Sequence, residues 1–319
     1  GYFEVQANNE YRRWHLSHPS EHASSSSGIS EMTRKIRLEP ITCDDSYDVI
    51  AYKEQLSDFY YHNYDGAFEP SDFNLLKLAC FCTMCGLIAH WLFWKGLLAD
   101  VIPWGSAKAL PYRVRILIWF ASFLYMDLTS GIIHIIFDNA PHDLPLLGFM
   151  AGGFQFHHYD PTAIIRISWF EYVSHVQFMC PLIEIAVILG NASRSLHLFW
   201  LFGGMWAHLF QTAHRWVHMP PSELPWIVNA MQSCGILLVP ERHMSHHEDL
   251  EHQFTILSGH TDVILDNLSL LVPPARYDLW FLLGALWFLL PFFADTIFRD
   301  SFHSASAGSK ADKMKVHQY

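Results

Sequence analysis

Residues 240–249, P-E-R-H-M-S-H-H-E-D, place three histidines within five positions. On a helix, His243, His246 and His247 would occupy positions i, i+3 and i+4, so that their imidazoles share one face. Clustered imidazoles pack poorly in an apolar core, whereas the neutral imidazole is a preferred ligand of iron, zinc and copper. The stretch therefore predicts one wall of a metal site, whose other ligands come from histidines elsewhere in the chain.

The composition of the chain indicates a membrane protein. Hydrophobic residues make up 51% of the 319 positions and charged residues only 16%, and the apolar residues fall in long runs. Much of the net charge of -11 lies in the polar first seventy residues, and no basic tract indicates nucleic-acid binding. The 21 histidines outnumber the 20 lysines and arginines together, which no ordinary requirement of folding explains.

The apolar runs predict an all-α, polytopic membrane protein with about four to five transmembrane helices and a histidine-rich cap on one membrane face. We expect residues 1–70 to form a polar N-terminal arm, residues 71–270 the membrane domain, and residues 271–319 a hydrophobic helix with a polar tail. The predicted runs are residues 73–97, 112–137, 176–189, 196–216 and 279–298. Residues 139–153 are expected to form loops, and residues 220–239 a helix lying on the membrane surface. Pro291 leaves a kinked span and a membrane-embedded hairpin as alternatives for the last run.

The order of the runs brings distant histidines together. If residues 112–137, 176–189 and 196–216 cross the membrane in succession, the histidines at their ends emerge on one face. His157 and His158 are neighbours about 100° apart on a helix, so each could serve a different metal ion. The predicted ligands are His134, His157, His158, His175, His214, His218, His243, His246 and His247.

Nine imidazoles exceed the three or four protein ligands of a tetrahedral zinc ion and suit two iron ions of higher coordination number. Nearby polar groups are expected to accept the second imidazole N–H and to fix the orientation of each ring. The candidates for this role are Asp127, Asp138, Asp160, Gln211, Glu248, Asp249 and His260. Such a centre just below a membrane surface could activate dioxygen and remove hydrogens from a lipid chain. No flavin, haem or dinucleotide motif is visible, so electrons would come from a separate donor.

Five segments, in this order, resemble the membrane lipid desaturases, the family that includes plasmanylethanolamine desaturase and the plastid desaturase that forms trans-3-hexadecenoate. The segments are D-L-T-S-G-I-I-H-I-I-F-D (127–138), H-H-Y-D-P-T-A-I (157–164), Q-T-A-H-R-W-V-H (211–218), L-L-V-P-E-R-H-M-S-H-H (237–247) and F-T-I-L-S-G (254–259). The resemblance implies a di-iron, oxygen-dependent desaturase whose electrons come from a donor such as cytochrome b5 or ferredoxin. His175 matches the plastid branch, whereas residues 157–164 look closer to the vinyl-ether branch, so the lipid substrate stays open.

Three alternatives remain at this point. A desaturase-like chain could be a structural or accessory subunit of a larger organellar membrane complex. A lipid hydroxylase would use the same metal centre, and a membrane hydrolase would hold zinc instead of iron. The expected location is an integral position in a membrane of the mitochondrion, the plastid or the endoplasmic reticulum. Lysines and arginines are spread over both predicted faces, so they give no orientation.

Overall fold

The computed structural model describes the chain from α4 onward, in the ranges 75–89, 92, 110–141, 144–145, 147–159, 161–166, 168–190 and 192–316. The predicted polar arm, residues 1–70, lies outside these ranges. Within them the chain forms helices and no β-strand, so the all-α prediction is confirmed there. The described helices are α4 (Leu75–Ala89), α6 (Tyr112–Asn139), α7 (Gly148–Tyr159), α8 (Ala163–Arg166), α9 (Trp169–Tyr172), α10 (Ser174–Leu189), α11 (Arg194–Val217), η3 (Pro221–Glu223), α12 (Trp226–Ser233), α13 (Pro240–Glu248), α14 (Asp262–Ser269) and α15 (Tyr277–Val316).

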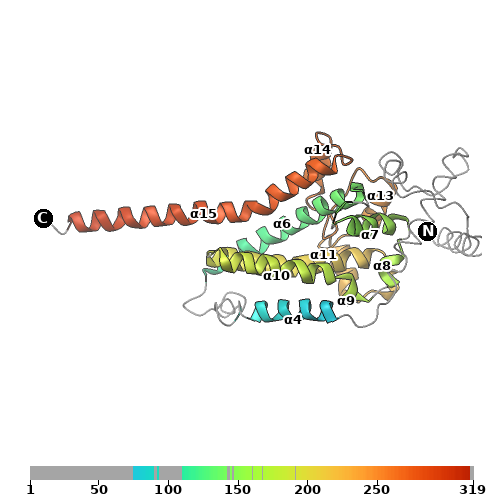
Figure 1. Ribbon diagram of the computed structural model, residues 1–319, viewed down its shortest axis with the longest axis horizontal. Helices are drawn as coiled ribbons and strands as arrows, with labels where there is room; N and C mark the ends of the chain where they lie inside the picture. Colours follow the sequence, from blue (N-terminus) through green and yellow to red (C-terminus); the bar gives the residue numbers. More distant parts are fainter. Residues whose placement is uncertain are drawn as a thin grey trace, which may run out of the picture. The chain divides into compact units, whose positions relative to one another are not determined.

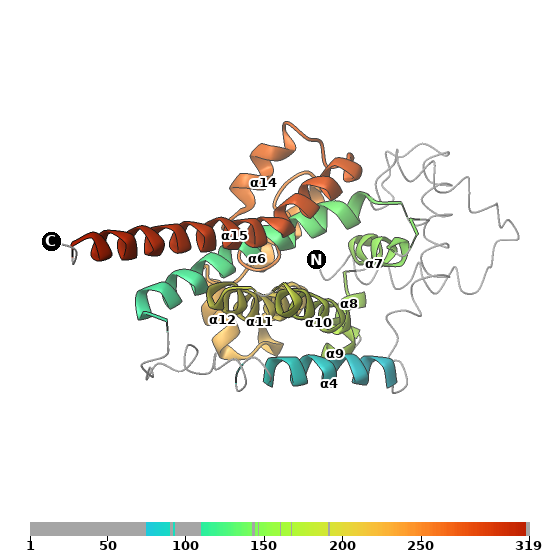
Figure 2. The same cartoon turned by 60° about the vertical axis from the view of Figure 1, so that its left-hand side comes forward.

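Helix α6 is the central element. It packs against α11, α15, α7 and α14, while α10 packs against α4 and α11 (Figure 1). In the rotated view α6 again runs between α15 and the α10–α11 pair (Figure 2). Its last three turns carry most of its buried residues, which places the polar end of this helix inside the protein.

Most of the predicted helices are present. Helix α6 covers the run 112–137, and α10 and α11 form the predicted hairpin, in which the Ser193 hydroxyl caps α11 by accepting a hydrogen bond from the Leu196 amide at 3.2 Å. One prediction was wrong, and one pair of alternatives is resolved. Residues 148–153 belong to α7 and not to a loop, and the last run is one helix that continues through Pro291, which excludes the membrane hairpin.

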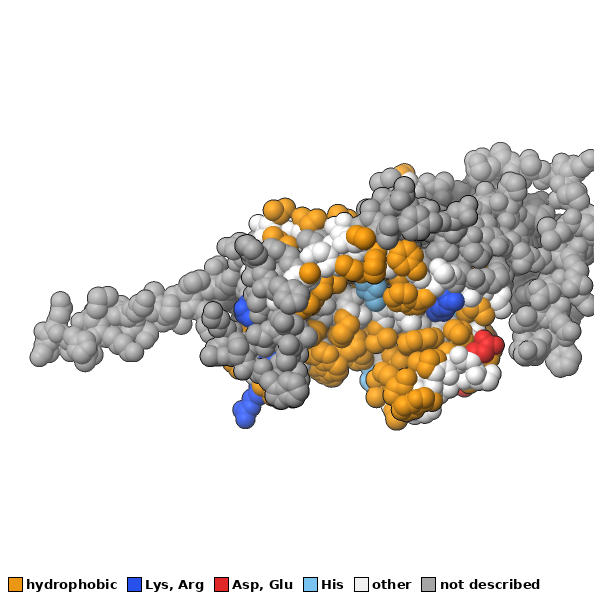
Figure 3. Space-filling model, turned by 90° about the horizontal axis from the view of Figure 1, so that it is seen from below, with side chains coloured by type: hydrophobic (Ala, Val, Ile, Leu, Met, Phe, Trp, Pro, Cys, Tyr) orange, Lys and Arg blue, Asp and Glu red, His pale blue; other side chains and the backbone are white. Residues whose placement is uncertain are grey.

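Two described helices are long and apolar enough to cross a membrane, α6 and the segment Tyr277–Ile297 of α15. Large apolar side chains on α15, among them Phe281, Leu286 and Phe293, are exposed, as expected of a helix that faces lipid. Figure 3 shows a face of the molecule on which hydrophobic side chains cover most of the described surface. The chain therefore has the surface of a membrane-associated protein, and the four to five spans stay a prediction.

Residues 254–262 are held against α6 by hydrogen bonds and close packing. The Asp127 carboxylate accepts hydrogen bonds from the Ser258 amide at 2.8 Å, the Thr261 amide at 2.9 Å and the Thr261 hydroxyl at 2.7 Å. One turn further along α6, a Cβ atom on Gly131 would lie 2.3 Å from Leu265 Cδ1, so a larger residue at this position would require Leu265 to move. These contacts hold the segment against the end of α6 that carries His134.

Candidate metal centre

Five histidines from three helical regions form the first ligand group. Each offers one ring nitrogen, and these five nitrogens all lie within 4.8 Å of one another. Nε2 of His243 lies 3.0 Å from Nε2 of His214, 2.9 Å from that of His218 and 3.0 Å from that of His247. The group consists of His157 on α7, His214 on α11, His218 at its C-terminal cap, and His243 and His247 on α13.

A second group lies beside the first and contains a carboxylate. His134, Asp138, His158 and His246 also place one ligand atom each within 4.8 Å of the others. The Asp138 Oδ1 atom lies 3.1 Å from His158 Nε2, and its Oδ2 atom lies 3.3 Å from His246 Nε2 and 3.5 Å from His134 Nε2. The His134 and His246 ring centroids lie 5.9 Å from that of His243, so the two groups adjoin.

The hydrogen bonds on the far side of the rings show that these atoms fit a cation. The Nδ1 atom of His134 faces the Phe254 carbonyl at 2.8 Å, and that of His246 faces the His252 carbonyl at 2.7 Å. A carbonyl only accepts, so each Nδ1 carries the proton and each Nε2 of a neutral ring carries a lone pair. Both lone pairs face the Asp138 carboxylate, an arrangement that a cation between them stabilises.

Two rings of the first group are oriented in a similar way. His157 donates from Nδ1 to the Phe154 carbonyl, which leaves the lone pair of its Nε2 atom 3.2 Å from Nε2 of His214. The Nδ1 atom of His214 is held by the Tyr172 hydroxyl at 2.8 Å. Fixed rings whose unprotonated nitrogens converge are the arrangement of a metal site.

Burial keeps these rings in the ligand form. Desolvation lowers the pKa of His157, His243 and His247 well below the ordinary value for histidine, and neighbouring imidazoles lower it further. The pKa of His218 falls to about 3, mainly by burial and then by the His158 and His134 imidazoles. A lowered pKa means a neutral imidazole at neutral pH, which is the form that binds a metal.

The structure brings eight of the nine predicted histidines together. The ninth, His175, is the second residue of α10, and its side chain lies outside the described part of the structure. Asp138, expected to support the ligands from outside, has its carboxylate among three imidazole nitrogens and belongs to a ligand group itself. The sequence carried a signal for this, because Asp138 follows His134 by four residues on one helix face.

The other predicted supporting residues act differently. Asp127 holds the loop at residues 258–261, as described above, and contacts that loop instead of a ligand ring. Gln211 is buried on α11 one turn before His214. Asp160 lies outside the described residues.

Three residues of that set are exposed. Glu248 and Asp249 point to solvent, and Asp249 lies 3.9 Å from the exposed His252 ring. His260 is also exposed, and its ring bonds to the Ser258 hydroxyl at 2.9 Å. Support for the ligand rings comes instead from the Phe254, His252 and Phe154 carbonyls and from the Tyr172 hydroxyl. Backbone carbonyls leave no residue-type signal in a sequence, and Tyr172 lies 42 residues from His214, so local spacing could not reveal either.

Comparison with known proteins agrees with this geometry. Residues 123–272 match the lipid desaturase domain, which confirms the resemblance seen in the sequence. The chain is 30% identical over 153 residues to the chloroplastic fatty acid desaturase 4-like 2 of Arabidopsis thaliana, covering 46% of this chain and 54% of that protein. It is 29% identical over 153 residues to the chloroplastic fatty acid desaturase 4 of the same plant, covering 46% of each chain. The chain thus spans about half the length of these curated relatives, and no solved structure matches it.

Proposed function

Because residues 123–272 match the lipid desaturase domain, we propose that this protein is a di-iron, oxygen-dependent desaturase that introduces a double bond into an acyl or alkyl chain of a membrane lipid. The observation that carries the proposal is the pair of adjoining ligand groups, built from eight imidazoles and the Asp138 carboxylate. Both ligand groups lie within the matched domain.

The number and kind of ligands favour two irons. The first group offers five nitrogens and the second three nitrogens and one oxygen. A tetrahedral zinc ion, whose sites hold three or four protein ligands, would leave part of the first group unused. Imidazole with a carboxylate is a donor set that suits iron, and five or six positions around each ion accommodate these groups with room for a small molecule.

Bound iron would supply the activation of dioxygen and the removal of two hydrogens from adjacent carbons of the lipid chain. In the overall reaction the lipid loses two hydrogens and dioxygen becomes two waters, with two electrons and two protons supplied from outside. The protein's own groups hold the ions through α6, α7, α11 and α13. They also exclude water, because His134, His157, His243 and His246 are buried.

The membrane topology, the electron donor and the location are part of the same proposal. The ligand groups would form a histidine-rich cap at one membrane face, above four to five spans of the chain. The polar arm would precede the membrane domain at residues 71–270, and the hydrophobic helix and tail at residues 271–319 would follow it. Electrons would come from an external donor such as cytochrome b5 or ferredoxin. The chloroplastic relatives and the apolar helices favour an organellar membrane as the location.

The test combines metal analysis with lipid analysis. The full chain, purified in detergent, is loaded with iron, supplied with membrane lipids and a chemical electron donor, and its lipids are analysed by mass spectrometry. We expect two irons per chain and a lipid product two hydrogens lighter. The double variant His246→Ala, His247→Ala removes one ligand from each group and should lose both the iron and the product.

Other outcomes would change the assignment. A product heavier by one oxygen would indicate a hydroxylase, and one zinc without iron would indicate a hydrolase. Unchanged lipids with full iron content, together with stoichiometric co-purification in a larger complex, would indicate a structural subunit. Circular dichroism of the double variant should show the helical content of the wild type, so that the loss of iron is not a loss of fold.

A further inference from the structure

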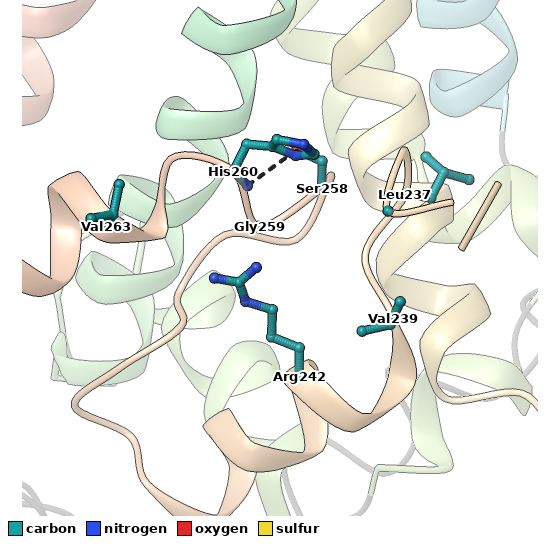
Figure 4. Close-up of a pocket in the computed structure, with 8 residues that line it drawn as sticks. Leu237, Val239, Arg242, Ser258, Gly259, His260 and Val263 are labelled. Carbon is teal, nitrogen blue, oxygen red and sulfur yellow. Dashed lines mark hydrogen bonds between the residues drawn. The ribbon is translucent and has the colours of Figure 1, made fainter. Parts of the chain in front are cut away.

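A pocket of about 310 Å³ lies beside α13, the helix that carries three of the ligand histidines. Its walls come from the connection between α12 and α13, from α13 itself, and from the loop that precedes α14 (Figure 4). Arg242 is the charged residue of this lining, and it directly precedes His243. Consecutive residues of a helix project about 100° apart, so α13 presents a metal ligand on one side and a guanidinium on another.

The guanidinium of Arg242 forms an ion pair with a buried carboxylate. Its Nε atom lies 3.3 Å from Oδ2 of Asp262, whose side chain is fully buried, whereas 40% of the Arg242 side chain is exposed. Figure 4 shows the arginine reaching from α13 toward the loop that carries Ser258, Gly259 and His260. Asp262 therefore engages the inner edge of the guanidinium, and its terminal amino groups remain for a partner in the pocket.

The backbone around the pocket is shaped by two glycines. Gly235 and Gly259 have φ values of 69° and 82°, and they are the glycines of the described chain in the left-handed region. Both line the pocket. A Cβ atom on Gly259 would lie 2.8 Å from Nη1 of Arg242, so any other residue here would displace the guanidinium.

Exposed aliphatic residues belong to the pocket lining or adjoin it in the sequence. Val263 lines the pocket with 63% of its surface exposed, and the adjacent Ile264 is 53% exposed. Ile236, between two lining residues, is 50% exposed. A single cation set among exposed aliphatic side chains suits a ligand that carries an anionic group on an apolar body, which is the chemistry of a phospholipid.

We propose that this pocket binds the phosphate of a membrane-lipid headgroup, with the terminal amino groups of Arg242 as its main partner. The inference rests on the proposed function and deepens it, since it assigns the residue and the pocket that would hold the headgroup of the lipid substrate. Arg242 acts here as a positioning residue, because the headgroup it binds lies apart from the reacting carbons. A guanidinium recognises phosphate through paired hydrogen bonds, which lysine cannot reproduce.

The test measures binding and does not depend on turnover. The metal-free full chain in detergent is titrated with dioctanoyl phosphatidic acid and with dioctanoylglycerol, which differ only in the phosphate, and lipid retention is measured by native mass spectrometry. We expect the wild type to bind the phosphate-bearing lipid about tenfold more tightly. Arg242→Gln should remove this preference, and Arg242→Lys should keep only part of it.

Arg276→Gln is the matched control, since Arg276 is an exposed arginine that also pairs with an aspartate, Asp278, at 2.8 Å. It should keep the full preference. If Arg242→Gln fails to fold, Gly259→Ala replaces it, because the added methyl group displaces the guanidinium without removing its charge.

Four results would overturn the assignment, and the first three concern the phosphate. They are equal binding of both lipids by the wild type, an unchanged preference in Arg242→Gln, and displacement of phosphatidic acid by inorganic phosphate at equal concentration, which would make the pocket a site for free phosphate. Displacement by octanoate at equal concentration would point to a fatty carboxylate instead and would also overturn it. Because binding is measured without metal, loss of product with intact binding counts against the proposed function alone, whereas loss of binding with normal product counts against the pocket alone.

Discussion

His157 and His158 are consecutive residues whose imidazoles belong to different ligand groups. Their ring centroids lie 4.3 Å apart, yet Nε2 of His157 lies 3.2 Å from Nε2 of His214, while Nε2 of His158 lies 3.1 Å from Oδ1 of Asp138. One turn at the end of α7 therefore contributes to both groups, and two bound ions would be close neighbours.

Replacing either residue of this pair should affect one ion at a time. We expect His157→Gln and His158→Gln each to lower the iron content from two per chain toward one, because each variant removes a ligand from a single group. Elemental analysis of the purified variants measures this. The control is His252→Ala, which removes an exposed ring and keeps the carbonyl that binds His246. Unchanged iron content in both variants would contradict the two-group assignment.

The carboxylate of Asp138 should contribute to metal affinity. Asp138→Asn removes the charge of a carboxylate whose two oxygens lie within 3.5 Å of three imidazole nitrogens, so we expect iron to bind about tenfold to a hundredfold more weakly. Titration of the loaded protein with a chelator measures the change. Glu248→Gln provides the comparison, since this acid is exposed. Equal iron affinity in the two variants would show that Asp138 is not a ligand.

The close approach of α14 to α6 should make Gly131 intolerant of substitution. In Gly131→Ala the new methyl group would lie 2.3 Å from Leu265 Cδ1 and 2.8 Å from Thr255 Cγ2, and we expect the free energy of unfolding to fall by about 1–3 kcal/mol. Thermal or denaturant unfolding in detergent measures it. Gly86→Ala on α4 is the control, because no atom lies within 4 Å of its added methyl, and it should be neutral or slightly stabilising. Equal losses in both variants would contradict the predicted crowding.

The buried imidazoles should make the metal-free protein sensitive to acid. The folded-state pKa of His218 is lowered to about 3, so below the ordinary value of 6.5 the unfolded chain binds a proton that the folded chain does not. Stability should therefore be complete above pH 6.5 and be lost progressively as the pH falls toward 3. Melting temperatures between pH 7 and 5 measure the slope, which should be shallower in His218→Gln. The control is His252→Gln, which replaces an exposed histidine and should leave the slope unchanged. A slope that becomes shallower in His252→Gln but not in His218→Gln would contradict the explanation.

The sequence predicted the helical parts of the metal centre because their spacing is local. His243, His246 and His247 share a face of α13 as their i, i+3, i+4 spacing requires, and the apolar run at 112–137 correctly placed α6. The ends of the predicted spans also brought His134 and His214 to the same region. These inferences needed only helical periodicity and the order of the apolar runs.

Other features depend on contacts that no local pattern encodes. The start of α7 was missed because residues 148–153 are rich in glycine, and packing against α6 outweighs their weak helix propensity. Glu248 and Asp249 were predicted to support the ligands because they adjoin them in sequence, but α13 turns both toward solvent. Asp127 was predicted to support a ligand ring, but it binds Ser258 and Thr261, which lie more than 130 residues away in the sequence.

The attachment of residues 254–262 to Asp127 orients two ligand rings before a metal ion binds. The same backbone, just before this attachment, supplies the Phe254 and His252 carbonyls that orient His134 and His246. Two ligand rings are therefore already immobilised, in the required tautomer, in the protein without metal. An incoming ion need not freeze their rotation, so more of the free energy of coordination would appear as affinity and the second group would act as a preorganised receptor.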